Sequence, residues 1–539
     1  MIKDTPSQDF EVPLEKTLFY RLFEVLPGAL SLASIALAFI LSALNPLWGS
    51  TYVLVVIIIV FIKGLSMIGN SWLGFRVMRQ ASLVDWHRRL LDLDEGEPFH
   101  SDKTEYHYAA HLQNIKNYRE HPSLYPKVDS VYQLVIIAAY NETADVLEPT
   151  IQSLVDSSCC KDRMIVCIAY EERGGSAMHQ TAQSVSRRYR DYFYDFVAVK
   201  HPQGLPGEII GKGGNISFAG RAMSRYLRRH KIKPEHVIVT TLDADNRPHQ
   251  SYFDYVAYEF ITRQNRQNLA FQPVALFLNN IWDTPAPVRV SAAGDSIFNT
   301  VNTARPHKIR NFAAHSQPMK ALEMMNFWSG RTIVEDGHQY WRSFFFLKGN
   351  YDILPIRVPI YQDAVLSSGY YKTLTDRFVQ VRRWAYGASD IPYVAEMIRR
   401  HHKNMPLAEA TFKFFDLLEG HVAWSSTAVV VLLGGWIPLL FGRGDNVFVH
   451  QLPLTISVIQ TVAVVGIIST IILFFRTLPI RPSRYSKRRS LSMWLQWVIY
   501  PVTALVYGSL AAFYSQMRLM SGSYLVKFDV TDKNTVIKD

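Results

Sequence analysis

Two aspartates follow a strongly apolar segment at a spacing that suits a metal ion. Asp243 and Asp245 come directly after VIVTTL (237–242), which has the composition of a buried strand. Carboxylates at i and i+2 after a strand can share one hard cation, and Mg²⁺ takes one or two carboxylates together with substrate phosphate oxygens. Aspartates also stabilise turns locally, so the pair alone is compatible with either a cation site or an ordinary turn.

A second acidic pair, Glu335-Asp336, stands at the start of an expected helix. It follows the short run TIV (332–334) and opens the segment DGHQYWRSFF. A carboxylate there could take the proton of an acceptor hydroxyl as a general base. Acidic residues are also favoured in the first turn of any helix, and this alternative is open on the residues alone.

Arginine and tryptophan occur together in QVRRW (380–384), within an amphipathic helix expected to start near Asp376. An arginine fork binds phosphate through two hydrogen bonds at once. Tryptophan offers an apolar face and a polar edge on which a sugar ring can stack. The alternative is a basic helix lying on anionic lipid, with its tryptophan at the interface.

A glycine-rich loop, Gly211-Lys212-Gly213-Gly214-Asn215, leads into a further helix. Backbone N–H groups at a helix start, together with Lys212, could cradle phosphate. The glycine spacing does not match the Walker pattern. An ordinary flexible loop is the competing interpretation.

The elements that must position these residues alternate between strand and helix from about residue 130. Buried parallel strands are indicated at 134–139, 164–169, 196–199 and 237–242, and helices near 145–156, 176–190 and 214–230. This alternation predicts an α/β domain with a doubly wound, mostly parallel sheet. Ligands bind beyond the carboxyl ends of such strands. That edge holds Tyr140, Glu142, Glu171, Glu172, His201, Asp243 and Asp245.

Long apolar runs flank this domain on both sides. The chain of 539 residues is 48% hydrophobic and 19% charged, with a mean hydropathy of +0.01, which excludes an intrinsically disordered protein. Spans are expected at about 26–44, 51–67, 421–441 and 454–475, with a tight turn at Asn45–Ser50. A fifth apolar stretch, 491–513, is interrupted by Pro501 and Gly508 and is expected to bend back or lie at the interface.

Positive charge in the short flanks sets the direction of the spans. Lysine and arginine gather after the second and fourth spans, whereas the loop between the third and fourth carries only Arg443. The N-terminus, the central domain and the 476–490 loop are therefore expected on the cytoplasmic side of a cell membrane (inner or plasma membrane).

The net charge of +11 and pI of about 9.3 suit anionic lipid or nucleotide phosphates, and the absence of a nucleic-acid motif argues against nucleic acid. Cys159, Cys160 and Cys167 are expected to be reduced and structural.

In this order the motifs resemble membrane-embedded family 2 glycosyltransferases of the cellulose synthase and hyaluronan synthase type. The matching segments are AAYNE (138–142), KGGN (212–215), DAD (243–245), ED (335–336), QVRRW (380–384) and FDVTDK (528–533). The resemblance covers roughly residues 130 to 535. It departs at Glu171-Glu172, where family members usually carry a DDG-like turn that contacts uracil.

The resemblance implies a GT-A fold and an inverting transfer from a nucleotide-diphosphate sugar, most simply a UDP-sugar. Asp336 would be the general base, and Asp245 would hold Mg²⁺ or Mn²⁺. The donor and its diphosphate would contact Asp243, Lys212, Gln380, Arg383, Tyr140, Glu142, Glu171 and Glu172. Trp384 would stack on the acceptor, while Phe528, Thr531 and Lys533 of a gating loop would close over the donor.

The resemblance favours a processive polysaccharide synthase coupled to export, with export or accessory subunits as further partners. One alternative is a transferase that adds a single sugar to a lipid-linked acceptor. Another is a transporter or channel with a degenerate domain, but the spans contain no obvious ionisable relay.

The domain arrangement expected is a cytosolic segment (1–25), two transmembrane helices (26–67), a cytosolic GT-A domain (68–375), amphipathic interface helices carrying QxxRW (376–420), two transmembrane helices (421–475), a basic cytosolic loop (476–490), an interfacial, re-entrant or fifth spanning helix (491–520) and a gating-loop tail (521–539).

Overall fold

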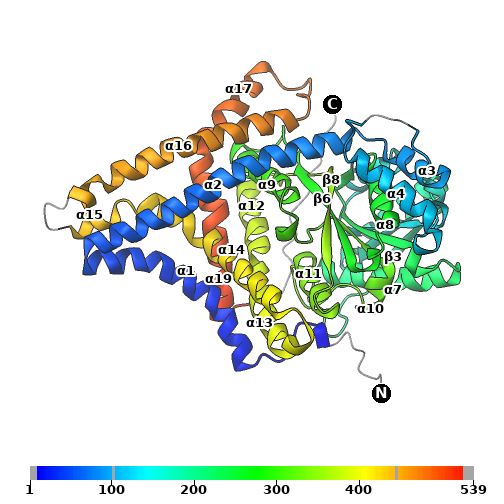
Figure 1. Ribbon diagram of the computed structural model, residues 1–539, viewed down its shortest axis with the longest axis horizontal. Coiled ribbons are helices and arrows are strands. Elements are labelled where there is room, and N and C mark those ends of the chain that lie inside the picture. The colour runs from blue at the N-terminus through cyan, green and yellow to red at the C-terminus, as the bar shows by residue number, and fades with distance from the viewer. Residues whose placement is uncertain (1–8, 100–102, 443–446, 526–539) are drawn as a thin grey trace.

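The computed structural model describes residues 9–99, 103–442 and 447–525. An α/β domain occupies one end of the molecule, and long apolar helices extend from it to the left in Figure 1. The polar middle of the sequence and its apolar flanks therefore separate in space as they do along the chain.

The α/β domain is built on one eight-stranded sheet of order β3-β2-β1-β4-β7-β6-β8-β5. Its strands are β1 (Tyr132–Ala139), β2 (Met164–Glu171), β3 (Asp195–His201), β4 (Val237–Asp243), β5 (Arg247–Pro248), β6 (Leu269–Phe277), β7 (His315–Pro318) and β8 (Asp352–Gln362). β1 to β4 pair in parallel, as do β6 and β8, whereas β7 and β5 pair antiparallel with their neighbours. The α/β class with a mostly parallel sheet, set among long apolar helices, is confirmed.

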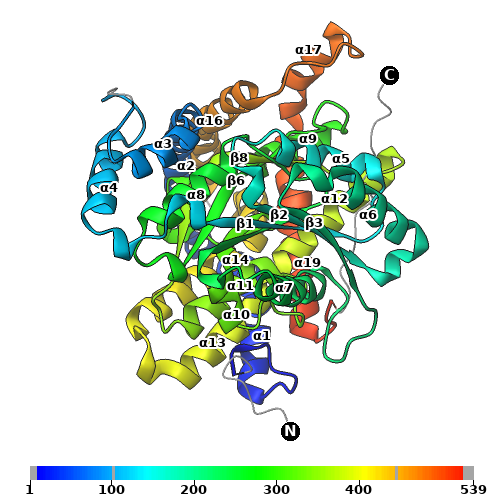
Figure 2. The same cartoon turned by 90° about the vertical axis from the view of Figure 1, so that its right-hand side faces the viewer.

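Helices cover both faces of this sheet, as Figure 2 shows. They are α3 (Trp86–Glu95), α4 (Tyr108–Glu120), α5 (Ala144–Val155), α6 (Gly175–Tyr189), α7 (Lys212–Arg229), α8 (Tyr252–Thr262), α9 (Ala286–Thr303), α10 (Met319–Met324) and α11 (Glu335–Phe346). Alternate residues of β1 enter two cores: Val135 and Ile137 pack with α5, α6 and α8, whereas Leu134 and Ile136 pack with α7 and α10. Burial on both faces explains why the strands are continuously apolar.

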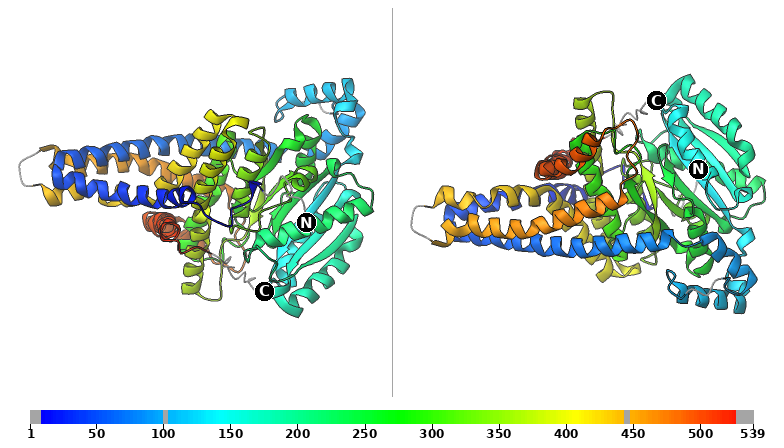
Figure 3. Two further views of the ribbon diagram at one scale, coloured as in Figure 1. Left: turned by 90° about the horizontal axis from the view of Figure 1, so that it is seen from below. Right: turned by 90° about the horizontal axis from the view of Figure 1, so that it is seen from above.

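Five helical segments are long and apolar enough to cross a membrane. Four of them run side by side in Figures 1 and 3: α1 (Leu18–Leu44), α2 (Pro46–Ser82), α14 (Leu407–Leu433) and α16 (Val447–Thr477). The short helix α15 (Ile437–Phe441) comes between α14 and α16 in the chain. The turn between the first two is tighter than expected. Asn45 alone separates them, capping α2 through its side chain, while Gly49 and Ser50 are already helical.

The fifth apolar segment runs across the other four. It comprises α17 (Lys487–Leu495), α18 (Tyr500–Thr503), the π-helix η13 (Ala504–Leu510) and α19 (Ala511–Ser521). α19 is vertical in Figure 1 and is seen end-on as the red helix in Figure 3, whereas the bundle is horizontal in both. It packs against α1 and against α12 (Tyr370–Ala385), and η13 packs against α14.

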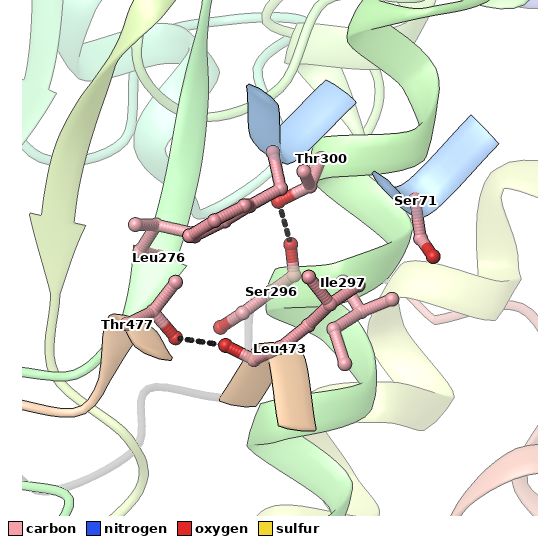
Figure 4. A pocket seen from close by; sticks show the side chains of 8 residues that line it. Ser71, Leu276, Ser296, Ile297, Thr300, Leu473 and Thr477 are labelled. Atoms are coloured by element: carbon pink, nitrogen blue, oxygen red, sulfur yellow. Dashed lines mark hydrogen bonds between the residues drawn. The ribbon is translucent and has the colours of Figure 1, made fainter. Parts of the chain in front are cut away.

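The bundle and the α/β domain meet at α9, which lies between β6, α2 and α16. Figure 4 shows the small pocket at this joint, lined by Ser71, Leu276, Thr300, Leu473 and other residues of these four elements. A Cβ on Gly74 of α2 would lie 2.2 Å from the Thr300 carbonyl oxygen. Glycine is therefore required for this close approach, which ties the base of the bundle to the sheet.

Candidate active site

Lys212 and Asp243 form the centre of the site at the carboxyl ends of the parallel strands. Lys212 is the first residue of α7, and its Nζ donates to Asp243 Oδ1 at 2.6 Å and to the Ala313 carbonyl at 3.1 Å. The Lys212 side chain is 9% exposed and that of Asp243 32% exposed. Asp243 therefore faces the open side of the site, while Lys212 lies beneath it.

The backbone around Lys212 explains the glycine-rich loop. A Cβ on Gly213 would lie 2.4 Å from the Ser329 carbonyl and 3.0 Å from the Glu335 Cβ, so only glycine fits there. The Asn215 side chain donates to the carbonyl of Ala139, the last residue of β1, and to that of Ala169, near the end of β2. The loop thus brings the start of α7, the ends of two strands and the start of α11 together.

Asp336 lies in the first turn of α11, half-buried and close to Lys212. Burial raises the pKa of its carboxyl above the ordinary aspartate value, while Lys212 and Arg383 act to lower it. The Gly337 N–H donates to Asp336 Oδ1 at 2.7 Å. A half-buried carboxylate with a raised pKa is suited to accept a proton near neutral pH.

Glu335, the other member of this acidic pair, shares the same environment. Burial, and then the neighbouring Asp336, raise the pKa of Glu335 above its ordinary value. Burial alone would lower the pKa of Lys212, but Asp243, Glu335 and Asp336 reverse this effect and leave it raised. One ammonium group therefore interacts with three carboxyl groups that two distant segments supply.

Asp245 points to a different part of the site from Asp243. Its Oδ2 accepts from the Asp363 backbone N–H at 3.0 Å, and its carbonyl accepts from Asn279 Nδ2 at 3.0 Å. Within the described ranges no group of three histidine, cysteine or acidic side chains could hold a metal ion by itself. The hard oxygen of buried Asp245 fits Mg²⁺ or Mn²⁺ only where a substrate supplies further oxygens.

The QVRRW motif lies on α12, which begins at Tyr370 rather than near Asp376. Arg383 is half-buried and near enough to Asp336 to lower the pKa of that carboxyl. Gln380 Oε1 accepts from Arg377 Nη1 at 2.5 Å, and the Trp384 ring centroid lies 5.7 Å from that of Phe277 at the end of β6.

Arg377 is a further residue of this helix that the motif analysis did not identify. It is buried and pairs with Asp295 of α9, and its guanidinium carbon lies 5.1 Å from the Trp384 ring centroid. Asp295 is 82 residues away in the sequence, so no local pattern could have revealed the pair. It fixes both Gln380 and Trp384.

The residues expected at the nucleotide end occupy the same edge of the sheet. Glu142 accepts from the backbone N–H groups of Tyr140 and Asn141 at 2.6 and 3.2 Å. Glu171 is buried and bound by Arg173, whose guanidinium carbon lies 4.4 Å from the Tyr140 ring centroid.

Glu171 and its neighbour Glu172 are not equivalent. Burial raises the pKa of Glu171, whereas Glu172 is exposed and accepts from Lys200 at 2.9 Å. Of the two, Glu171 is the one placed beside Tyr140 at the inner edge of the site.

Phe528, Thr531 and Lys533 lie outside the described residues. The described chain approaches the site just before them, because the Leu525 N–H donates to the Tyr386 hydroxyl at 3.3 Å. Tyr386 follows α12 directly after the QVRRW motif. The tail therefore begins beside the helix that carries Arg383 and Trp384.

The comparisons with known proteins find similarity at the level of solved structures. No family model matches the chain, and no curated protein matches it. The chain is similar to the mannosyltransferase PcManGT from Pyrobaculum calidifontis in complex with GDP-Man and Mn²⁺, with a TM-score of 0.41, 14% identity, and coverage of 78% of this chain and 98% of that one.

It is also similar to residues 1–349 of S. aureus TarS in complex with UDP, with a TM-score of 0.35, 12% identity, and coverage of 75% and 95%. The same protein in complex with UDP-GlcNAc gives a TM-score of 0.31 at 12% identity, with coverage of 65% and 93%.

Proposed function

We propose that this protein is a membrane-embedded inverting glycosyltransferase that uses a nucleotide-diphosphate sugar. The observation that carries the proposal is the convergence of Lys212, Asp243 and Asp336 from α7, β4 and α11, with Arg383 of α12 beside them. Elements far apart in the sequence supply a cation, a donor-side carboxylate and a half-buried base at the ligand-binding edge of a parallel sheet.

The reaction assigns a separate task to each side chain. The acceptor hydroxyl oxygen attacks the anomeric carbon, the bond from that carbon to the diphosphate oxygen breaks, and Asp336 takes the hydroxyl proton. Arg383 and Gln380 hold the departing diphosphate, and Asp243 and Lys212 hold the nucleotide. Stabilising charge on the leaving group and activating the nucleophile are the two requirements of such a displacement.

Asp245 is proposed to contribute one ligand to Mg²⁺ or Mn²⁺. Such a cation would stabilise negative charge on the diphosphate. Asp245 is buried at the turn after β4, two residues beyond Asp243, and this supports a site completed by the donor rather than by the protein alone.

The acceptor is proposed to be a growing polysaccharide that is extended processively and exported. Trp384 supports this because α12 packs between β6 of the catalytic domain and η13 of the apolar helices. A chain stacked on Trp384 would therefore lie where the catalytic domain meets the membrane part.

Residues 315–328 are largely part of the protein core and so are not proposed to line the acceptor side. Met319 and Met325 are buried, and buried His315 accepts from Trp328 Nε1 at 3.2 Å.

The catalytic domain is proposed to face the cytoplasm, with the lipid bilayer around α1, α2, α14 and α16. The arginine-rich loop after α16 and the basic end of α2 lie at the domain end of the bundle, which agrees with the positive-inside rule. The crosswise course of α17 to α19 supports an interfacial position for the fifth apolar segment.

The proposal is tested with purified protein in lipid or detergent with Mg²⁺ or Mn²⁺. A panel of UDP-, GDP- and other nucleotide sugars is supplied, and nucleoside diphosphate release is followed while the products are sized. Release from one donor with a ladder of polymer is expected. A single added sugar on a lipid acceptor would replace the processive mechanism, and no release from any donor would contradict the proposal.

A further inference from the structure

The chain before the first apolar helix is inserted into the catalytic domain. We call residues Phe10–Val12 the N-terminal strap. The Phe10 ring stacks on His401 at 4.7 Å and meets the Phe346 ring edge-on at 5.5 Å. The Phe10 carbonyl accepts from the Tyr393 hydroxyl at 2.8 Å. The strap is therefore anchored between α11 and α13 (Asp390–His401).

Arg342 of α11 connects the strap to the loop that precedes the proposed base. Its side chain is 2% exposed, and each of its three guanidinium nitrogens donates at least one hydrogen bond. Nε donates to the Phe10 carbonyl, Nη1 to the Phe327 carbonyl and Gln339 Oε1, and Nη2 to the Met325 carbonyl, while the Glu11 carboxylate lies 3.3 Å from Nη2. Glu11 supplies the negative charge that this buried guanidinium needs.

The turn that Arg342 holds is strained. Asn326 and Phe327 both have positive φ, at 56° and 65°. Side chains other than glycine rarely adopt this conformation, and two in succession persist only where surrounding contacts hold them. The carbonyls on which Arg342 acts belong to this turn, at Met325 and Phe327.

Glu11 also binds the next part of the same loop. Its carboxylate accepts from the Ser329 hydroxyl, and Ser329 Oγ accepts from the Arg331 N–H at 3.1 Å. Arg331 Nη1 donates to the Val12 carbonyl at 3.1 Å. The loop from Ser329 to Val334 is thus held to the strap by two contacts, Ser329 with Glu11 and Arg331 with Val12.

The position of Ser329 matters for the site because its carbonyl touches the start of α7. That carbonyl is the atom that excludes a side chain at Gly213, next to Lys212. If Ser329 moved, its carbonyl would press on the backbone next to Lys212. The same movement would displace Glu335 and Asp336, which follow Ser329 in the chain. The strap therefore controls the separation between the base and the cation beside it.

We propose that Glu11 is a positioning residue, which fixes the Ser329–Val334 loop and so sets Asp336 against Lys212. The inference rests on the proposed glycosyl transfer, in which Asp336 acts as the base. The contacts of Glu11 are to Arg342 and to Ser329 of this loop, so we expect its effect on the rate of the chemical step rather than on donor binding.

The test compares Glu11→Gln and Glu11→Asp with the wild type in the full-length protein. Glu11→Gln should lower kcat about tenfold, because small displacements of catalytic groups are costly, and leave the donor KM within about twofold. Glu11→Asp keeps the charge and should recover part of the rate. Glu396→Gln is the matched control, since Glu396 is also buried and paired with arginines but lies on α13 away from the loop.

A second readout separates this inference from the proposed function. Amide hydrogen exchange in peptides covering 329–336 should rise in Glu11→Gln and not in Glu396→Gln, whether or not any donor is turned over. Unchanged exchange in that loop would overturn the strap's role. If Glu11→Gln left kcat unchanged, or lowered kcat/KM only by raising the donor KM, the proposed positioning role of Glu11 would be wrong even though the enzyme is an active transferase.

Discussion

At the residue scale, the charge balance around Lys212 determines how the base behaves. Lys212 lowers the pKa of Asp336, against the larger effect of burial, which raises it. Asp336 must be deprotonated to accept the acceptor's proton. The acidic limb of the rate profile therefore reports the pKa that these opposing effects set.

Lys212→Met should move that acidic limb to higher pH. Without the ammonium, the pKa of Asp336 rises further, so more of the base is protonated at any pH below the limb. We expect kcat/KM near neutral pH to fall by about 10- to 100-fold, with partial recovery at higher pH. Lys212→Arg keeps the charge and should keep the limb close to its wild-type position; a limb that stays in place in Lys212→Met would contradict this role.

The same pKa shift has a consequence for stability. A carboxyl whose folded pKa is raised favours folding below its unfolded pKa and loses that contribution as pH rises through the folded value. Asp336→Asn removes the cost of a buried charge, so its melting temperature should exceed that of wild type at neutral to alkaline pH and converge with it at acidic pH. Asp352→Asn, at an exposed aspartate, should show no such difference.

At the element scale, the strands and helices that the sequence predicted are those with strong local patterns. The runs 134–139, 164–169, 196–199 and 237–242 all lie within observed strands, because strands buried on both faces are apolar at every position. Helix ends were predicted less well. α12 starts at Tyr370, six residues before Asp376.

What the sequence could not show are contacts between distant elements. The sequence motifs include Asp243, Asp336 and Arg383, but they include neither the pair of buried Arg377 with Asp295 nor the Glu11–Arg342 pair. Their partners are separated by 82 and 331 residues of chain. Such pairs carry no local signature, because only the fold brings them together.

A chain of polar groups joins three apolar helices at the point where α19 crosses. Ser425 donates to Ser31 and Ser31 to Gln516 Oε1, both at 2.6 Å, while Gln516 Nε2 donates to the His421 carbonyl at 2.7 Å. All three side chains are buried. In an apolar environment, such a chain holds α1, α14 and α19 in one arrangement.

Gln516→Leu should weaken this crossing. Ser31 and the His421 carbonyl each lose a partner, and we expect a loss of about 1 kcal/mol, the scale of interhelical hydrogen bonds in membranes. Thermal unfolding in detergent checks this, with Gln451→Leu as the control at an exposed position of α16. Equal melting temperatures for the two variants would show that the chain does not stabilise the crossing.

At the scale of the whole molecule, the crosswise course of α17 to α19 decides where the tail emerges. α19 ends beside the start of α1, where Arg21 Nη1 donates to the Leu519 carbonyl at 2.8 Å. The Tyr524 hydroxyl donates to Glu24 at 2.8 Å. Both chain ends therefore leave the described structure on the catalytic side of the bundle.

A cysteine at Thr535 tests this topology in a variant lacking Cys159, Cys160 and Cys167. A membrane-impermeant thiol reagent should label it only after the cells are permeabilised, because the tail is expected in the cytoplasm with the catalytic domain. A cysteine at Asn446, in the loop between the third and fourth spans, should label in intact cells. Labelling at Thr535 in intact cells would instead place the fifth segment across the membrane.

The most direct test of the central claim is nucleoside diphosphate release and product formation by wild type and Asp336→Asn, measured with the same donor and divalent cation. Loss of the base should lower transfer by about 10² to 10⁴-fold while donor binding is retained, and Asp352→Asn should match wild type. Transfer at the wild-type rate in Asp336→Asn would show that Asp336 does not act as the base and that the proposed mechanism is wrong.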